Sequence, residues 1–255
     1  MIHERIPLTV PDADGPAELI TYAPDNFPEL GGQRLRSAVI ICPGGGYRFL
    51  SDREGEPVAL RFAGLGFAAF LLRYHVAPQG RWPVPQRQLL SAVAYVRDNW
   101  ERYHVDPHAV VVMGFSAGGH LAGSAGLLWN KQELYRPLRR RPSAFRPDGA
   151  VLCPPFFIWH NADDVGVPVE NALLLDKALR AKGGASELHI YPSGGHGQSL
   201  ADYTVFAPGE DWRASAPCAV WVNHCAAWLH RNFGDYAVGP HPDEAEKKKK
   251  KKGKK

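Results

Sequence analysis

The sequence lacks the features that mark several whole classes of protein. Its four cysteines show no metal-ligand spacing, and most lie among apolar residues, which is typical of reduced core thiols: Cys42, Cys153, Cys218 and Cys225. No apolar run is long enough to span a bilayer. Residues 1–7 contain neither an apolar stretch of signal-peptide length nor a small-residue cleavage site. We therefore expect a cytoplasmic protein without a membrane or metal partner.

A concentrated basic surface is also missing from the body of the chain. The eight lysines among residues 247–255 account for more than the whole formal charge of +4, so the remainder is mildly acidic. Neither glycine-rich phosphate motif, G-x-x-x-x-G-K-[ST] or G-x-G-x-x-G, occurs. These absences argue against nucleotide or specific nucleic-acid binding by the folded part. The lysine-rich end alone leaves room for association with polyanions.

What is present is an alternation of short apolar runs with amphipathic stretches from Ser37 onward. This order predicts an α/β fold, a mostly parallel central sheet with helices on both faces. We expect one domain over residues 1–236 and a disordered lysine-rich tail over 237–255. The expected strands are one or two within 1–36, then 38–42, 67–74, 109–113, 149–153, 156–160 and 188–191, and the expected helices are 54–63, 86–104, 117–129, 168–182 and one through Trp221 and Trp228.

The most informative motif is G-x-S-x-G at residues 114–118. It directly follows the β-branched run ending at Met113 and directly precedes a helix-compatible segment. A strand that turns sharply into a helix holds its serine in a strained, exposed position, and side chains at 114 and 118 would clash. The helix N-terminus favours the negative charge that develops in acyl transfer. Ser116 is thus predicted to be a nucleophile, the alternative being a plain tight turn.

A serine nucleophile needs a general base, which a carboxylate orients. The sequence supplies acids and a histidine at the ends of later strands, in the order Ser, Asp, His. His196 lies in a glycine-flanked loop and is the predicted base. Of the neighbours Asp163 and Asp164, one is expected to contact the imidazole and the other to cap the following helix. We favour Asp163 as the acid.

The loop at Pro43–Tyr47 carries three successive glycines. Backbone N–H groups in such a loop can stabilise the oxyanion of a tetrahedral intermediate, and the N–H of Ala117 is the expected partner donor. Tyr47, directly after the glycines, is predicted to contact the substrate and to restrict the acyl group to acetyl through butyryl. The alternatives are a flexible turn and a phosphate loop, and the absence of both phosphate motifs argues against the latter.

Together these motifs resemble the α/β-hydrolase superfamily, and more closely its small acetyl-esterase and acetylxylan-esterase-like branch. The similarity rests on residues 42–47, 114–122, 159–164, 167–171, 187–191 and 195–197. It implies the α/β-hydrolase fold, with Ser116, Asp163 and His196 as the triad and Gly45, Gly46 and Ala117 as oxyanion donors. It also implies hydrolysis of short acyl esters, often acetyl groups on sugars, without a cofactor. The partner is then a small-molecule ester.

One departure from this branch is a missing segment. Family members carry a long stretch between the strand after the nucleophile helix and the strand bearing the acid, whereas here Pro154-Pro155 alone joins Cys153 to Phe156. Parallel neighbours need a crossover of a dozen or more residues. We therefore predict that 149–153 and 156–160 are not adjacent parallel strands. Residues 156–160 are expected to keep a central place in the sheet, and 149–153 to give way, as a short piece collinear with them or as a loop.

Three further functions remain open from the residues. A peptidase of the prolyl-oligopeptidase type has a similar Ala-Asp-Asp motif, but this chain has no propeller-sized region before the hydrolase motifs. A non-catalytic binding protein with a hydrolase fold would result if the acid strand were displaced. The third is polyanion association through the lysine-rich end. A serine carboxylesterase is the leading hypothesis, with its oligomeric state unknown.

Overall fold

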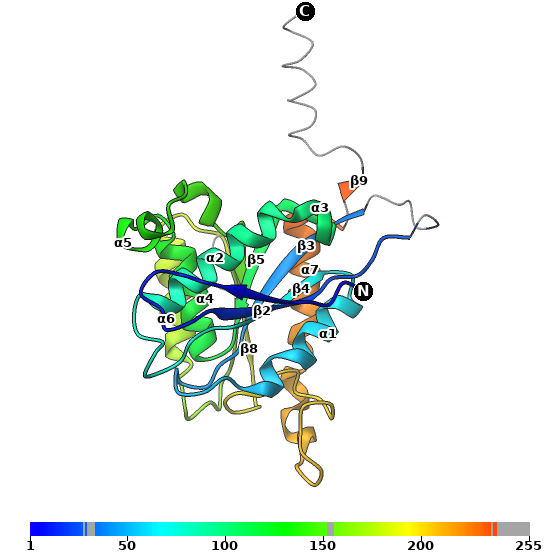
Figure 1. Cartoon of the computed structure of the whole chain (residues 1–255). Helices are drawn as coiled ribbons and strands as arrows, with labels where there is room; N and C mark the ends of the chain where they lie inside the picture. The colour runs from blue at the N-terminus through cyan, green and yellow to red at the C-terminus, as the bar shows by residue number, and fades with distance from the viewer. Residues whose placement is uncertain (28, 30–33, 152–155, 236, 239–255) are drawn as a thin grey trace, which may run out of the picture.

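A mostly parallel sheet forms the centre of the molecule (Figure 1), as predicted. The structure, a computed structural model of the whole chain, describes residues 1–27, 29, 34–151, 156–235 and 237–238. In spatial order the strands are β1 (Arg5–Leu8), β2 (Ala17–Tyr22), β4 (Ala68–Arg73), β3 (Arg34–Cys42), β5 (Val105–Gly114), β6 (Gly149–Val151), β7 (Phe156–Asn161) and β8 (Ser186–Tyr191). β2 runs antiparallel to β1 and β4, and every other neighbouring pair in this order is parallel.

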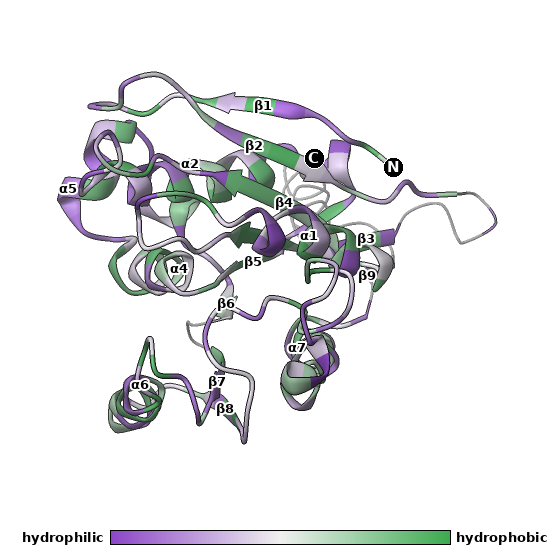
Figure 2. Cartoon of the chain, turned by 90° about the horizontal axis from the view of Figure 1, so that it is seen from below, coloured by the Kyte–Doolittle hydropathy of each residue, from purple (hydrophilic) through white to green (hydrophobic). Residues whose placement is uncertain are grey.

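Helices cover both faces of the sheet, which Figure 2 shows nearly edge-on. The helices and 3-10 turns are η2 (Asp52–Glu54), α1 (Glu56–Gly64), α2 (Val84–Asp98), α3 (Trp100–Tyr103), α4 (Ala117–Leu128), α5 (Gln132–Tyr135), η3 (Arg136–Leu138), η4 (Pro142–Phe145), α6 (Glu170–Ala181), η5 (Trp212–Cys218) and α7 (Trp221–Phe233). α2, α4 and α6 contribute to one apolar core, and α1 and α7 to the other. Along β3, Ile40 faces the first core and Ile41 the second, because successive strand residues point to opposite faces.

The register of the sheet brings the predicted functional loops to one edge. Cys42 at the end of β3 pairs with Gly114 at the end of β5, so the glycine-rich loop and the segment at Ser116 leave neighbouring strands side by side. Asn161 at the end of β7 pairs with Tyr191 at the end of β8. The segments carrying the aspartates and the histidine therefore leave the same carboxyl edge, where ligands of open α/β sheets bind.

The prediction for the shortened region is wrong in its main point. β6 and β7 are adjacent and parallel, joined through the pair Ala150 and Phe156. The crossover rule applies to extended ladders, whereas β6 and β7 share one ladder pair among the residues that the structure describes. About six residues of chain also reach far beyond one strand spacing. The expectation that β7 keeps a central place is confirmed, since it lies between β6 and β8. Cys153 and Pro154-Pro155 lie outside the described residues.

Near the C-terminus, a short strand lies within the range expected to be a disordered tail. Ala237 and Val238 form a short strand, β9 (Ala237–Val238), that pairs with Leu35 and Arg34 of β3, because this edge of β3 extends beyond its parallel neighbours. Residues 239–255 lie outside the described part of the chain.

Three of the cysteines occupy the interior as expected. Cys42, Cys218 and Cys225 are free and buried. Within the described residues, no helix is both long and apolar enough to cross a membrane. The cytoplasmic location stays a prediction.

Candidate active site

Ser116 stands at the turn between β5 and α4 in a conformation that few side chains adopt. Its backbone has φ 48° and ψ −118°, and it is the residue directly before the first turn of α4. Non-glycine residues rarely take a positive φ, and those that do cluster at functional sites. The side chain is consequently exposed beside the N-terminus of a 12-residue helix, whose dipole favours negative charge there.

The two glycines of the motif are required by close backbone contacts. A Cβ at Gly114 would lie 2.1 Å from Gly118 O, and one at Gly118 would lie 2.0 Å from Cys42 O. We expect Gly118→Ala to lower the free energy of unfolding by about 3 kcal/mol, since backbone cannot yield as a flexible side chain can. Urea unfolding followed by circular dichroism measures the loss.

The matched control is Gly64→Ala, because an added Cβ at Gly64 meets nothing within 4 Å and the residue is helical. Alanine there should leave the stability within about 1 kcal/mol of the original or raise it. Equal stabilities of the two variants would contradict the packing argument.

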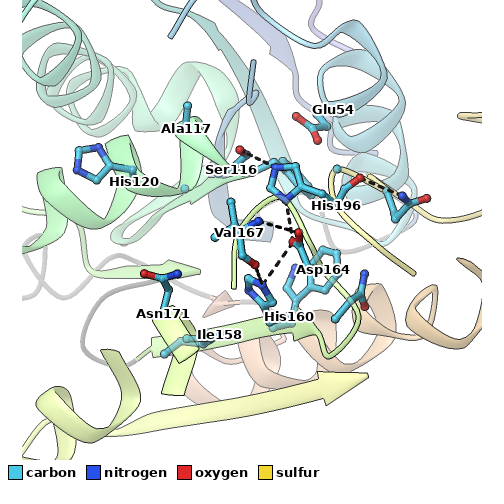
Figure 3. Close-up of a pocket in the computed structure, with 18 of the residues that line it drawn as sticks. Glu54, Ser116, Ala117, His120, Ile158, His160, Asp164, Val167, Asn171 and His196 are labelled. Atoms are coloured by element: carbon cyan, nitrogen blue, oxygen red, sulfur yellow. Dashed lines mark hydrogen bonds and ion pairs between the residues drawn. The ribbon is translucent and has the colours of Figure 1, made fainter. Parts of the chain in front are cut away.

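A hydrogen-bonded chain connects Ser116, His196 and an aspartate across three loops (Figure 3). Ser116 Oγ lies 2.9 Å from His196 Nε2, and His196 Nδ1 lies 2.7 Å from Asp164 Oδ2. With the ring proton on Nδ1, the imidazole donates to the carboxylate and accepts from the hydroxyl. This is the arrangement in which a histidine removes a proton from a serine.

The acid in contact with the imidazole is Asp164, and the prediction that Asp163 makes this contact is wrong. Asp163 turns to the loop before the histidine, where its carboxylate accepts from the N–H groups of Gly195 (2.8 Å) and Gly194 (3.2 Å). Neighbouring residues in a turn point their side chains in different directions, and sequence spacing does not say which one faces inward. Asp163 instead fixes the shape of the loop that carries His196.

The carboxylate of Asp164 is buried and held in place by backbone hydrogen bonds. Its side chain is 5% exposed, and Oδ1 accepts from the N–H groups of Gly166 and Val167, each at 2.8 Å. Burial raises the pKa of Asp164, but the Val167 N–H, His196 and the Gly166 N–H outweigh it and hold the pKa below its usual range. Hydrogen bonds from Gly195 and then Gly194 likewise lower the pKa of Asp163.

The glycine-rich loop after β3 presents N–H groups that protein atoms leave free. Gly45 has φ +125°, and a Cβ there would lie 2.0 Å from Phe49 O, so only glycine fits. The N–H of Gly44 donates to Glu54. By contrast, the N–H groups of Gly45, Gly46 and Ala117 donate to no acceptor among the described residues.

Tyr47 lies beside the candidate site but not on the wall of its cavity. Its hydroxyl is 2.9 Å from Nδ1 of His120, whose side chain does line the cavity. Burial raises the pKa of Tyr47, so the hydroxyl stays protonated. Ala77 N–H donates to Tyr47 O at 2.7 Å, which fixes the loop from the other side.

A cavity of about 530 Å³ opens beside Ser116 and His196. It extends between α4 and α6 along the face of β7, where Phe157, Ile158 and Leu175 give it an apolar wall. Asn171 and His120 add polar groups farther from the serine (Figure 3). Among the residues that the structure describes, no cluster of three His, Cys, Asp or Glu side chains suits a metal ion.

Sequence reasoning missed several residues that shape this site. His160 lies 2.8 Å from Val167 O and 3.4 Å from Asp164 Oδ2, Asn161 Nδ2 donates to Gly195 O, and Glu54 holds Gly44. For His160 and Asn161 the signal was their position at the end of a strand before the acids. Glu54 gave no signal beyond its place near the start of a helix.

A nucleophile-bearing turn between a strand and a helix, on a mostly parallel sheet flanked by helices, defines an α/β hydrolase. The chain belongs to the α/β-hydrolase superfamily. A crystal structure of an α/β-hydrolase enzyme from a Medee basin deep-sea metagenome library is 32% identical, superposes with a TM-score of 0.74, and matches 90% of this chain and 97% of its own.

Other relatives point to esterases. The chain matches the BD-FAE family over residues 27–146. An acetylxylan esterase of Xylanibacter ruminicola is 30% identical over 72% of this chain and 44% of its own length. The acetyl ester-xyloside bifunctional hydrolase of Caldicellulosiruptor lactoaceticus is 27% identical, with a TM-score of 0.72 over 91% of this chain and 97% of that one. The chain spans only 34%, 60% and 44% of the first three curated relatives that it matches.

Proposed function

We propose that this protein is a serine carboxylesterase that hydrolyses short-chain acyl esters, including acetylated sugars. The observation that carries the proposal is the hydrogen-bonded chain from Ser116 through His196 to Asp164. In this proposal Ser116 is the nucleophile, His196 the general base and acid, and Asp164 the orienting acid. The acid role passes from Asp163 to Asp164 because only the latter contacts the ring.

The reaction proceeds in two acyl transfers. The Ser116 hydroxyl gives its proton to His196 Nε2 while Oγ attacks the ester carbonyl, and Asp164 stabilises the resulting imidazolium. The imidazolium then protonates the alcohol oxygen, the ester bond breaks and an acyl-enzyme remains. Water then attacks the acyl-enzyme while His196 takes a proton from it. The imidazolium returns this proton to Ser116 Oγ as the acyl bond breaks, which releases the carboxylic acid and restores the serine.

The free N–H groups of Gly45, Gly46 and Ala117 are proposed to stabilise the oxyanion of each tetrahedral intermediate. Backbone donors suit this task because they are held in place before the reaction and need no reorientation. Each such donor is worth about 2.7–4 kcal/mol of barrier.

Acyl preference is the finer part of the proposal. Of the relatives, one is an acetylxylan esterase and one an acetyl ester-xyloside hydrolase, which favours acetyl groups on a sugar. His120, which lines the cavity and is held by the Tyr47 hydroxyl, limits the space on that side. We therefore expect kcat/KM for p-nitrophenyl esters to fall from acetyl and butyryl to dodecanoyl, by about tenfold or more.

A series of p-nitrophenyl esters from acetyl to dodecanoyl, with purified protein, measures this preference. All esters are kept below the critical micelle concentration of the longest one, so that the comparison of kcat/KM reports the preference of the site and not aggregation of the substrate. Faster turnover of dodecanoyl than of acetyl esters would contradict the short-chain assignment, but not the esterase itself.

The alternative function, a non-catalytic binding protein, requires that the strand before the aspartates lies too far from His196 for contact. β7 instead carries Asp164 to His196, which supports the catalytic hypothesis. Hydrolysis of p-nitrophenyl acetate at a rate above the Ser116→Ala background decides between the two.

A further inference from the structure

Glu54 is a carboxylate buried beside the reacting residues, and the reaction described above gives it no part. The residue is 3% exposed and lines the same cavity as Ser116 and His196. In Figure 3 it lies across from the serine and the imidazole. Glutamate is almost never buried without partners, because its charge loses the solvation of water. A buried ionisable group in a cleft is a candidate functional residue.

One side of Glu54 holds the start of the oxyanion loop. Oε2 accepts from the N–H of Gly44 at 2.8 Å. Gly44 is itself pressed against the nucleophile turn, since a Cβ there would lie 2.8 Å from Phe115 O and 3.1 Å from Ser116 Cβ. Glu54 therefore fixes the point from which the N–H groups of the following glycines are aimed.

Its other side faces the loop that carries the histidine. A Cβ at Gly197 would lie 3.6 Å from Glu54 Oε1. Next to these two residues, Ser199 Oγ donates to Arg53 O, which ties the histidine loop to η2. Glu54 thus stands between the two loops whose relative position determines the geometry at Ser116.

Several charged or titratable groups face this carboxylate. They are Arg53 of the same turn, His196 of the histidine loop and the buried Tyr74 hydroxyl after β4. Asp164 lies on the far side of the imidazole, with His160 behind it. Burial holds the pKa of Glu54 above its usual range, and the Gly44 N–H, Arg53, His196 and the Ser51 hydroxyl oppose that rise only in part.

We propose that Glu54 is a positioning residue that holds the oxyanion loop through Gly44 and whose negative charge stabilises the imidazolium form of His196. The proposal rests on the esterase function. In this proposal two carboxylates stabilise the imidazolium: Asp164 by its hydrogen bond to the ring, and Glu54 through space, without contact. Removal of the charge should therefore change how the site responds to pH, which loss of packing alone would not do.

Glu54→Gln and Glu54→Ala separate the two roles. Glutamine keeps an oxygen that accepts from Gly44 N–H but removes the charge. We expect a fall of about tenfold in kcat, and the acidic limb of the kcat/KM profile should move to lower pH by about 0.5–1 unit. Alanine also removes the acceptor, so kcat should fall by about 100-fold with KM within about twofold. Asp52→Asn, which changes a 91% exposed carboxylate in the same turn, should leave both readouts unchanged.

A Glu54→Gln profile that superimposes on the original would overturn the role of the charge, and an undiminished kcat in Glu54→Ala would overturn the positioning role. If Glu54→Ala does not fold, the proposal is tested by kcat and the pH profile of the nearly isosteric Glu54→Gln variant.

An unmodified protein that does not hydrolyse p-nitrophenyl acetate would defeat the esterase proposal separately. The pH titration of the His196 ring by NMR, in the unmodified protein and in the Glu54→Gln variant, still tests the charge. A lower midpoint in the variant upholds the proposal, and an equal midpoint overturns it.

Discussion

Ser116→Ala and His196→Ala are each expected to remove nearly all hydrolysis of p-nitrophenyl acetate, by about 10⁶-fold in kcat. The reason is that the two groups act as a unit. Without the hydroxyl there is no atom to form the acyl-enzyme, and without the imidazole the hydroxyl keeps its proton at neutral pH. Initial rates at saturating ester, corrected for spontaneous hydrolysis, measure the loss.

The double variant provides the control for this unit behaviour. Removing both side chains should lower kcat about as much as removing one, whereas the fold losses in kcat would multiply if the two groups contributed independently. Circular dichroism should be unchanged, since both side chains lie at the exposed edge of the sheet. Activity retained in Ser116→Ala would assign the nucleophile to another residue.

The second large effect is expected at Asp164. Asp164→Asn should lower kcat by about 10⁴-fold, because an amide can present its NH₂ to His196 Nδ1 and favour the tautomer that cannot accept from Ser116. Asp163→Asn should cost less than about tenfold, because its amide oxygen can still accept from a backbone N–H. Steady-state kinetics of the two variants, made in parallel, give the comparison.

Because Asp163 and Asp164 are adjacent in the chain, the Asn variant at each position serves as the control for the other. Both remove one negative charge from the same turn, so a general electrostatic effect would lower both rates alike. The reverse ranking would return the acid role to Asp163 and would mean that the hydrogen bond at 2.7 Å is not the productive one.

Local patterns predicted the fold and the two residues, Ser116 and His196, that the structure brings together, whereas contacts between distant segments decided the rest. The strand–turn–helix around Ser116 was readable because the strained turn requires glycines at fixed offsets, and those offsets are visible in the chain. His196 followed from its order along the chain and its glycine-flanked loop. Both depend on backbone geometry that short sequences specify.

The choice between Asp163 and Asp164 was not readable in the same way. It depends on which carboxylate faces the histidine loop, and that loop is separated from the aspartates by α6 and β8. Glu54 is a similar case, since its partner Gly44 belongs to another element. The adjacency of β6 and β7 could not be read from the sequence, because the crossover rule holds for long ladders and the described residues of these strands pair only at Ala150 and Phe156.

The pair of Ala150 with Phe156, the one ladder contact between β6 and β7 in the described part of the sheet, also divides the candidate site into two blocks. Ser116 belongs to the block built on β5, whereas Asp164 and His196 belong to the block of β7 and β8. Across the sheet the two blocks meet at Ala150 and Phe156, and α7 bridges them through Trp221, which packs on both Phe115 and Trp159. Both apolar cores cross this boundary, so partial separation along it would disturb them and would part the proposed base from the proposed nucleophile. Trp221 is therefore expected to help hold the proposed base beside the proposed nucleophile.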